Sequence, residues 1–232
     1  MMHYRGMLVA VLLSAGATLI QAQTSQQWRD SLQVLNRMID QWPRSTDLRL
    51  KKAAVNIQLG QWDYAVEEYA NVLRLDEKNP AALYFRAYAL THLRQYAQAR
   101  ADYEKLLQEV PLHMEGRLGL ALVNEKMGRT RDALDGYNQL VEMFPDSALC
   151  YAARAAFEST QQQYDVALYD WDEAIRRQPS NADYVVTKAD LLIALGRYDE
   201  ARSTLEKALQ QGVPRGVLRE WFDKCRKAAT TR

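Results

Sequence analysis

The chain is poor in the residues on which metal, redox and phosphate chemistry depend. Its 232 residues include 2 cysteines and 3 histidines, too few cysteines for a disulfide-dense scaffold, and His92 and His113 have no cysteine or histidine nearby with which to bind zinc. No glycine-rich phosphate loop, HExxH or GxSxG sequence occurs anywhere in it. We therefore predict no metal, no cofactor and no catalytic residue, and we expect a protein that is not an enzyme.

An excess of one charge is also missing. The chain has 30 basic and 29 acidic residues, a formal net charge of +1. A protein that binds nucleic acid or an anionic membrane usually carries a basic surplus, so neither partner is expected. With 48% hydrophobic and 25% charged residues, the composition is that of an ordinary globular protein.

Residues 1–22 resemble an export signal. Arg5 supplies a short basic region, an apolar stretch runs from Met7 to Ile20, and Ala22 is a small residue at which cleavage can occur. The stretch is short and rich in small residues for a membrane-spanning helix; an uncleaved anchor is the alternative. We expect an exported, periplasmic protein of a bacterial envelope, without a membrane span once the signal is removed.

Alanines recur every thirty-four residues in two columns, which is typical of a helical repeat array. One column is Ala53, Ala87, Ala121, Ala155 and Ala189, and the other is Ala65, Ala99, Ala133, Ala167 and Ala201. The two alanines of each repeat are twelve residues apart, enough to place them on successive helices joined by a turn. Small side chains let helix axes approach to about 8 Å, so each alanine predicts a close helix contact.

Further columns identify the repeat. A turn sequence separates the two helices: Gly60-Gln61-Trp62, Arg94-Gln95-Tyr96, Gly128-Arg129-Thr130, Gln162-Gln163-Tyr164 and Gly196-Arg197-Tyr198. A bulky residue follows the second alanine by four positions, and Pro111, Pro145 and Pro179 close their units. Glycine suits the left-handed conformation that ends a helix, so we expect slight strain where Arg94 and Gln162 replace it.

This pattern resembles the tetratricopeptide repeat (TPR) family over residues 46–215. The resemblance implies an all-α fold, a right-handed α-solenoid of five TPR helix pairs with a concave binding groove. The five units are 46–79, 80–113, 114–147, 148–181 and 182–215. Amphipathic sequences in residues 23–45 and 216–232 predict N- and C-terminal capping helices, as solenoids require. We expect a monomer in which Cys150 and Cys225 lie too far apart for a disulfide.

Paired charges recur within the units. The base before the first alanine and the residue before the bulky position form the pairs Lys52/Glu68, Arg86/Asp102, Leu120/Gly136, Arg154/Asp170 and Lys188/Thr204. Base and acid are both absent from the third unit. We therefore predict a structural ion pair between the two helices of a unit, in preference to a catalytic pair.

The resemblance also implies where a partner binds, because the first helix of each TPR unit lines the concave groove. From the second and third units it assigns to this groove Tyr84, Tyr88, His92, Glu115, Leu118, Leu122 and Glu125. Some TPR domains grip a terminal carboxylate with lysine, arginine and asparagine, a set that is missing here. The alternative is that these aromatic side chains only pack between neighbouring helices.

We therefore expect a non-enzymatic scaffold that binds a protein or peptide segment in its groove. An accessory subunit that binds a glycan or small ligand there is the alternative function. A terminal interface formed by Trp221 and Phe222 is the alternative site.

Overall fold

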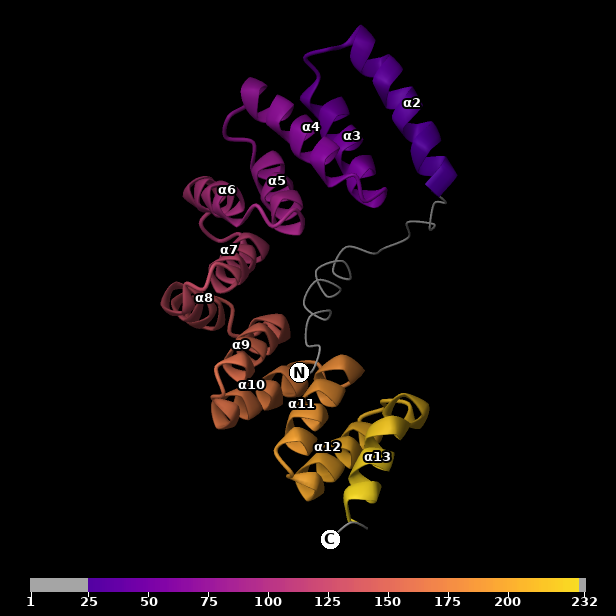
Figure 1. Ribbon diagram of the computed structural model, residues 1–232, viewed down its shortest axis with the longest axis vertical. Helices are drawn as coiled ribbons and strands as arrows, with labels where there is room; N and C mark the ends of the chain where they lie inside the picture. Colours follow the sequence, from indigo (N-terminus) through magenta and orange to yellow (C-terminus); the bar gives the residue numbers. More distant parts are fainter. Residues whose placement is uncertain (1–24, 230–232) are drawn as a thin grey trace. The chain divides into compact units, whose positions relative to one another are not determined.

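A computed structural model describes residues 25–229, with side chains described to residue 226, and every element in this range is an α-helix (Figure 1). The helices are α2 (Ser25–Gln41), α3 (Thr46–Gln58), α4 (Trp62–Leu75), α5 (Pro80–His92), α6 (Tyr96–Glu109), α7 (Met114–Lys126), α8 (Thr130–Met143), α9 (Ala148–Thr160), α10 (Tyr164–Arg177), α11 (Ala182–Ala194), α12 (Tyr198–Gln210) and α13 (Arg215–Ala229). The expected all-α fold is confirmed. The predicted export signal lies outside the described residues.

Local chemistry sets the ends of the helices. The side chains of Ser45 and Asn79 accept hydrogen bonds from the backbone N–H of Leu48 and Ala82, which caps α3 and α5. At the opposite end the chain turns through a left-handed residue. The positions concerned are Gly60, Arg94, Gly128, Gln162 and Gly196, with φ between 60° and 73°. Arg94 and Gln162, where strain is expected, therefore adopt the same left-handed conformation as the glycines.

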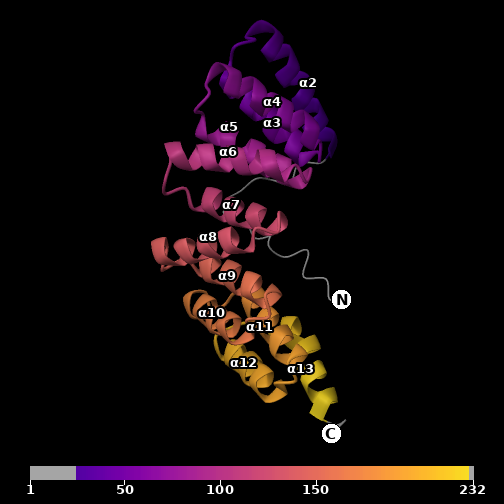
Figure 2. The ribbon, with the colours of Figure 1, turned by 60° about the vertical axis from the view of Figure 1, so that its left-hand side comes forward.

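The chain divides into two compact units, and the division falls within α8, between Gly136 and Tyr137. In the first unit, consecutive helices from α2 to α7 pack on one another, as both ribbon views show (Figure 2). In the second, α9 to α13 pack in the same sequential way, and α13 also contacts α11. Each of the two compact units has its own hydrophobic core. Because consecutive helices pack on one another, a side chain on one helix is buried by the helices before and after it.

The alanine columns mark the helix contacts as predicted. All ten alanines are buried, at 0% or 1% exposure. Glycines on α7 and α8 allow two further close contacts. A Cβ on Gly119 of α7 would lie 2.4 Å from the Tyr103 ring of α6, and one on Gly136 of α8 would lie 3.0 Å from the Cβ of Ala121. These contacts exist because neither glycine has a side chain.

The terminal helices differ in how well they are covered. On α2 only Ile39 is buried, whereas on α13 Leu218 and Cys225 are buried and Trp221 and Phe222 pack against the second core. Cys150 and Cys225 form no disulfide with each other, as expected. No helix among the described residues is both long enough and apolar enough to cross a membrane.

Candidate protein-binding face

All seven side chains assigned to the groove lie on α5 and α7, in the first of the two compact units. Six are partly exposed and available for contact: Tyr84, Tyr88, His92, Glu115, Leu122 and Glu125. Leu118 is 2% exposed and belongs to the interior, so its assignment to the binding surface is corrected. It lies between Gly116 and Gly119, where α7 approaches the side chains of α6 most closely.

Two aromatic groups share helix α5. In the first, the His92 ring stacks on Trp62 with ring centroids 4.0 Å apart and planes 2° apart. The edge of Tyr88 faces both rings, at 6.0 Å from Trp62 and 4.6 Å from His92. Trp62 begins α4, so this group joins α4 to α5.

Tyr84 lies one turn before Tyr88 and forms the second group. Its ring stacks on His113 at 5.1 Å and meets the edges of Phe85 and Tyr103. The Nδ1 atom of His113 accepts the N–H of Gly116 at 3.1 Å, which caps α7 and fixes the imidazole ring. We call Trp62, Tyr84, Tyr88, His92 and His113 the aromatic face.

The environment of Tyr84, Tyr88 and His92 favours the uncharged form of each side chain. Burial, together with the charge of Glu115 and nearby Tyr88, raises the pKa of Tyr84 to about 12. Burial likewise raises the pKa of Tyr88 and lowers that of His92, which favours the neutral imidazole. The assigned residues that carry charge are therefore Glu115 and Glu125 at the α7 edge.

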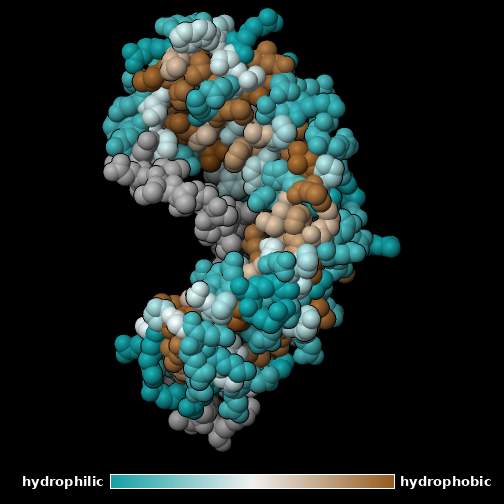
Figure 3. Space-filling model, turned by 180° about the vertical axis from the view of Figure 1, so that it is seen from behind, coloured by the Kyte–Doolittle hydropathy of each residue, from teal (hydrophilic) through white to brown (hydrophobic). Residues whose placement is uncertain are grey.

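The acids at that edge have different environments. The Glu115 side chain is 42% exposed and is available to a basic group of a partner. The Glu125 side chain is 19% exposed, and Lys126 Nζ lies 3.0 Å from it. Over the first unit, in the upper half of Figure 3, apolar side chains reach the surface among hydrophilic ones. The surface therefore offers both apolar and acidic contacts to a ligand.

Two of the predicted ion pairs are formed between Arg and Asp side chains. Arg86 Nε and Nη2 donate to the two carboxylate oxygens of Asp102 at 2.7 and 2.6 Å. Arg154 forms the same fork with Asp170, which is fully buried. In each pair both carboxylate oxygens accept a hydrogen bond from the arginine on the other helix, the geometry of a two-pronged structural contact.

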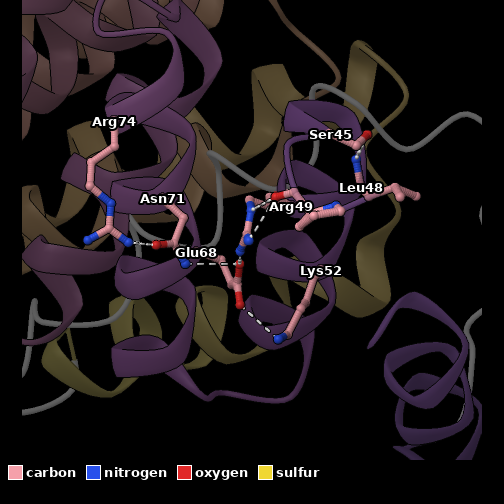
Figure 4. Close-up of polar contacts among 8 residues, drawn as sticks. Ser45, Leu48, Arg49, Lys52, Glu68, Asn71 and Arg74 are labelled. Carbon is pink, nitrogen blue, oxygen red and sulfur yellow. Dashed lines mark hydrogen bonds and ion pairs between the residues drawn. The ribbon is translucent and has the colours of Figure 1, made fainter. Parts of the chain in front are cut away.

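Glu68 shows the same contact in the first pair, with a second base added. Lys52 Nζ lies 2.7 Å and Arg49 Nη1 2.9 Å from its two oxygens, and Figure 4 shows both bases reaching it from α3. Burial would raise the pKa of Glu68, but the hydrogen bonds and charges of Lys52, Asn71 and Arg49 outweigh it and lower the pKa. The carboxylate is therefore held ionised in the folded protein.

One predicted pair is wrong. Lys188 does not contact Thr204; its ammonium group binds Asp172 on α10, the helix that precedes α11. Thr204 instead donates its hydroxyl to the carbonyl of Glu200. A base at this position lies between the second helix of its own repeat and the second helix of the preceding repeat, so it can contact either one. Arg154 shows both contacts at once, with Asp170 on one side and Asn138 at 3.0 Å on the other.

Sequence reasoning missed Trp62 and His113 as members of the aromatic face. Both belong to the segments that precede or begin a helix, and the groove positions of the family lie within first helices. The signal was present in the repeat columns, since Trp62 occupies the aromatic turn position. Phe85, which is 42% exposed and stacks on Tyr69, was also missed.

Comparison with known proteins identifies the repeat. A family model described as Tetratricopeptide repeat matches residues 50–113, and a second of the same description matches residues 90–157 and 160–215. Among curated proteins, the DnaJ homolog subfamily C member 7 homolog of Dictyostelium discoideum is 22% identical over 204 residues, 81% of this chain and 38% of that protein. The chain spans between 17% and 40% of the length of the curated relatives it matches.

Solved structures show the same fold. A tetratricopeptide repeat protein from Parabacteroides merdae ATCC 43184 has a TM-score of 0.66 and 20% identity, covering 86% of this chain and 78% of that one. YrrB, described as a TPR protein with an unusual peptide-binding site, has a TM-score of 0.58 and 16% identity, covering 84% of this chain and 97% of that one.

Proposed function

Because the chain belongs to the tetratricopeptide repeat family, we propose that it is a non-enzymatic scaffold that binds a segment of another protein on the aromatic face. The observation that carries the proposal is the pair of aromatic groups on α5, whose rings are fixed by stacking yet remain partly exposed. A surface fixed before binding loses little conformational entropy when a partner arrives. The peptide-binding site named for YrrB supports the same kind of ligand.

The chemistry of the face defines the segment. Tyr84 and Tyr88 offer flat, uncharged rings, so the segment carries apolar or aromatic anchors spaced to reach both. Glu115 at the edge favours a basic residue beside those anchors. Charges at a rim chiefly set the association rate, whereas buried anchors set most of the affinity.

We place this scaffold in the bacterial envelope, with residues 1–22 removed on export. The support is the sequence of that segment, with Arg5 before the apolar stretch and Ala22 after it. Mass spectrometry of the protein recovered from its native envelope tests the proposal. A mature N-terminus near Gln23 is expected, and one that begins at Met1 or Met2 would exclude cleavage.

Affinity capture from the same envelope, with crosslinking, identifies the partner, and variants then locate its site. The double variant Tyr84→Ala/Tyr88→Ala should weaken binding by about 2 kcal/mol or more, roughly 30-fold, with helicity largely retained. The matched control is Tyr64→Ala, because Tyr64 is 62% exposed on α4 and belongs to neither aromatic group. Glu115→Lys should slow association and change its salt dependence.

Two results would overturn the proposed site. Normal binding by the double tyrosine variant, with loss of binding when Trp221 and Phe222 are made polar, would assign the interface to α13. A thermal shift with oligosaccharides and none with the captured protein would favour the glycan-binding alternative.

A further inference from the structure

Helix α2 has a wider apolar surface than its neighbour covers. Helix α2 packs on α3, and one stripe of its apolar residues is covered: Trp28, Leu32 and Leu35 are partly buried, and Ile39 is buried. A second stripe lies beside it and is exposed: Val34 at 47%, Met38 at 37% and Trp42 at 55%. At 100° per residue, these two stripes form one broad apolar sector.

The later repeats show what normally covers the second stripe. Adding multiples of thirty-four to Met38 gives Val72, Leu106, Leu140, Ala174 and Ala208, all at 0% or 1% exposure. Met38 is therefore exposed at a position that is fully buried in each following pair. Among the helices of residues 25–229, none lies beside α2 in the place that α3 holds beside α4.

The same comparison shows that the exposed stripe is not built for a charged neighbour. Val34 corresponds to Glu68, Asp102 and Asp170, the acids that bind a base on the first helix of their own pair. On α2 this position is apolar, and the two charges that flank the stripe are Asp30 and Arg37, both exposed. An occupant of this surface must suit an apolar centre with one acid and one base beside it.

We propose that this surface, Asp30, Val34, Arg37 and Met38, binds a second copy of the chain, with the two α2 helices antiparallel about a twofold axis at Val34. Asp30 lies about 6 Å before Val34 along the helix axis and Arg37 about 4.5 Å after it, at 1.5 Å per residue. Reversal of the partner helix therefore brings Asp30 level with the partner copy's arginine, to within about 1.5 Å along the axis.

The sideways positions agree with this pairing. At 100° per residue, Asp30 and Arg37 lie about 40° and 60° to the same side of Val34. A twofold axis perpendicular to both helices keeps that side common to the two copies, so the Asp30–Arg37 contact occurs twice. On the other side Met38 meets Ser31 of the second copy, whose small side chain leaves room for the methionine.

The proposed interface between the two α2 helices is small, which limits the affinity of the dimer. Stable complexes bury about 1,200–2,000 Å², and one pair of helices with few large apolar side chains buries less. We therefore expect a reversible dimer that forms as concentration rises into the micromolar range or above, and the monomer expected from the sequence when the protein is dilute.

Sedimentation equilibrium over a concentration series tests the proposal on the chain as it is recovered, with its N-terminus established by mass spectrometry. Asp30→Arg and Arg37→Asp should each weaken the dimer at least tenfold, because each places like charges together at both contacts. An equimolar mixture of the two variants should restore association, since every contact again joins an acid to a base. Asp40→Arg is the matched control: it makes the same charge change on α2, away from the stripe, and should leave the dimer intact.

A wild-type chain that stays monomeric at all concentrations would overturn the proposal, as would single variants that dimerise normally or a mixture that stays monomeric. None of these variants alters α5 or α7. Failure of this inference is therefore distinguishable from failure of the proposed partner site.

Discussion

At the residue scale, the turn after each first helix needs a left-handed backbone whatever side chain occupies it. Gly60, Gly128 and Gly196 meet this need, and a Cβ added at any of them would find no atom within 4 Å. Arg94 and Gln162 adopt nearly the same φ, 60° and 62°, with a side chain present. The difference between these turns is therefore backbone strain, without a packing contribution.

We expect Arg94→Gly and Gln162→Gly to raise the free energy of unfolding, each by up to about 1 kcal/mol. The left-handed conformation costs a non-glycine residue about 1–2 kcal/mol, and part of the gain is offset by the greater freedom of glycine in the unfolded chain. Gly196→Ala should lower stability by about 1 kcal/mol. Urea denaturation midpoints measure all three, and a gain from Gly196→Ala would contradict the strain argument.

The Arg86–Asp102 pair should show strong coupling. Arg86→Leu leaves a buried carboxylate without its base, and we expect a loss of about 2–4 kcal/mol, because the arginine side chain is still 25% exposed. Asp102→Ala should also destabilise, and the double variant should cost less than the sum of the two. Additive losses in this double-mutant cycle would mean that the contact contributes no energy.

The repeats explain which of these contacts the sequence predicts. Arg86 with Asp102 and Arg154 with Asp170 are found because base and acid recur together and disappear together in the third unit. The Lys188 contact is missed because the sequence separation of sixteen occurs on both sides of a base, toward Thr204 and toward Asp172. A column comparison within one unit considers only the first of them.

At the scale of the element, α7 is the helix that departs most from the repeat pattern. Each of its two glycines lowers helix propensity by about 1 kcal/mol relative to alanine. Because they have no side chain, the side chains of α6 can approach the backbone of α7. Tyr103 lies over Gly119, and Leu106 lies over Gly116. The sequence predicts the helix from Ala121, but the burial of Leu118 follows from contacts with other helices that the repeat columns do not encode.

This reasoning predicts opposite results for the same substitution at two helical glycines. Gly119→Ala should lower stability by about 1–3 kcal/mol despite the better helix former, because the Tyr103 ring must move. Gly216→Ala on α13 should cause no loss, since its Cβ would meet nothing within 4 Å. Thermal unfolding of the two variants checks this. Equal stability of Gly119→Ala and the parent would show that the Tyr103 ring of α6 can move aside without lowering the free energy of unfolding.

At the scale of the whole molecule, two buried glutamates give the two units opposite responses to acid. In the first unit, the bases around Glu68 outweigh its burial and lower its pKa. In the second, burial raises the pKa of Glu158 on α9; Arg154 opposes this shift, and Asp170 adds to it. The effect at Glu158 is not evident from the sequence, because Asn56 and Leu90 occupy the corresponding positions in the first two repeats.

The signs follow from linkage. The lowered pKa of Glu68 means that its contribution is present above the unfolded value of about 4.5 and is lost as the pH falls through the folded pKa. The raised pKa of Glu158 means the reverse: stability is highest below about 4.5 and is lost as the pH rises through the folded pKa. At neutral pH, Glu68 therefore stabilises the first unit, and ionised Glu158 destabilises the second.

We therefore expect Glu68→Gln to reduce hydrogen-exchange protection of α3 and α4 at pH 7 and to have less effect near pH 4. Glu158→Gln should increase protection of α9 and α10 at pH 7, and this gain should shrink near pH 4, where the native carboxyl is already neutral. Comparing each variant with the parent at the same pH cancels intrinsic exchange rates and the titration of other groups. A loss of protection in Glu158→Gln at pH 7 would show that its charge is stabilised by Arg154 more than it is penalised by burial.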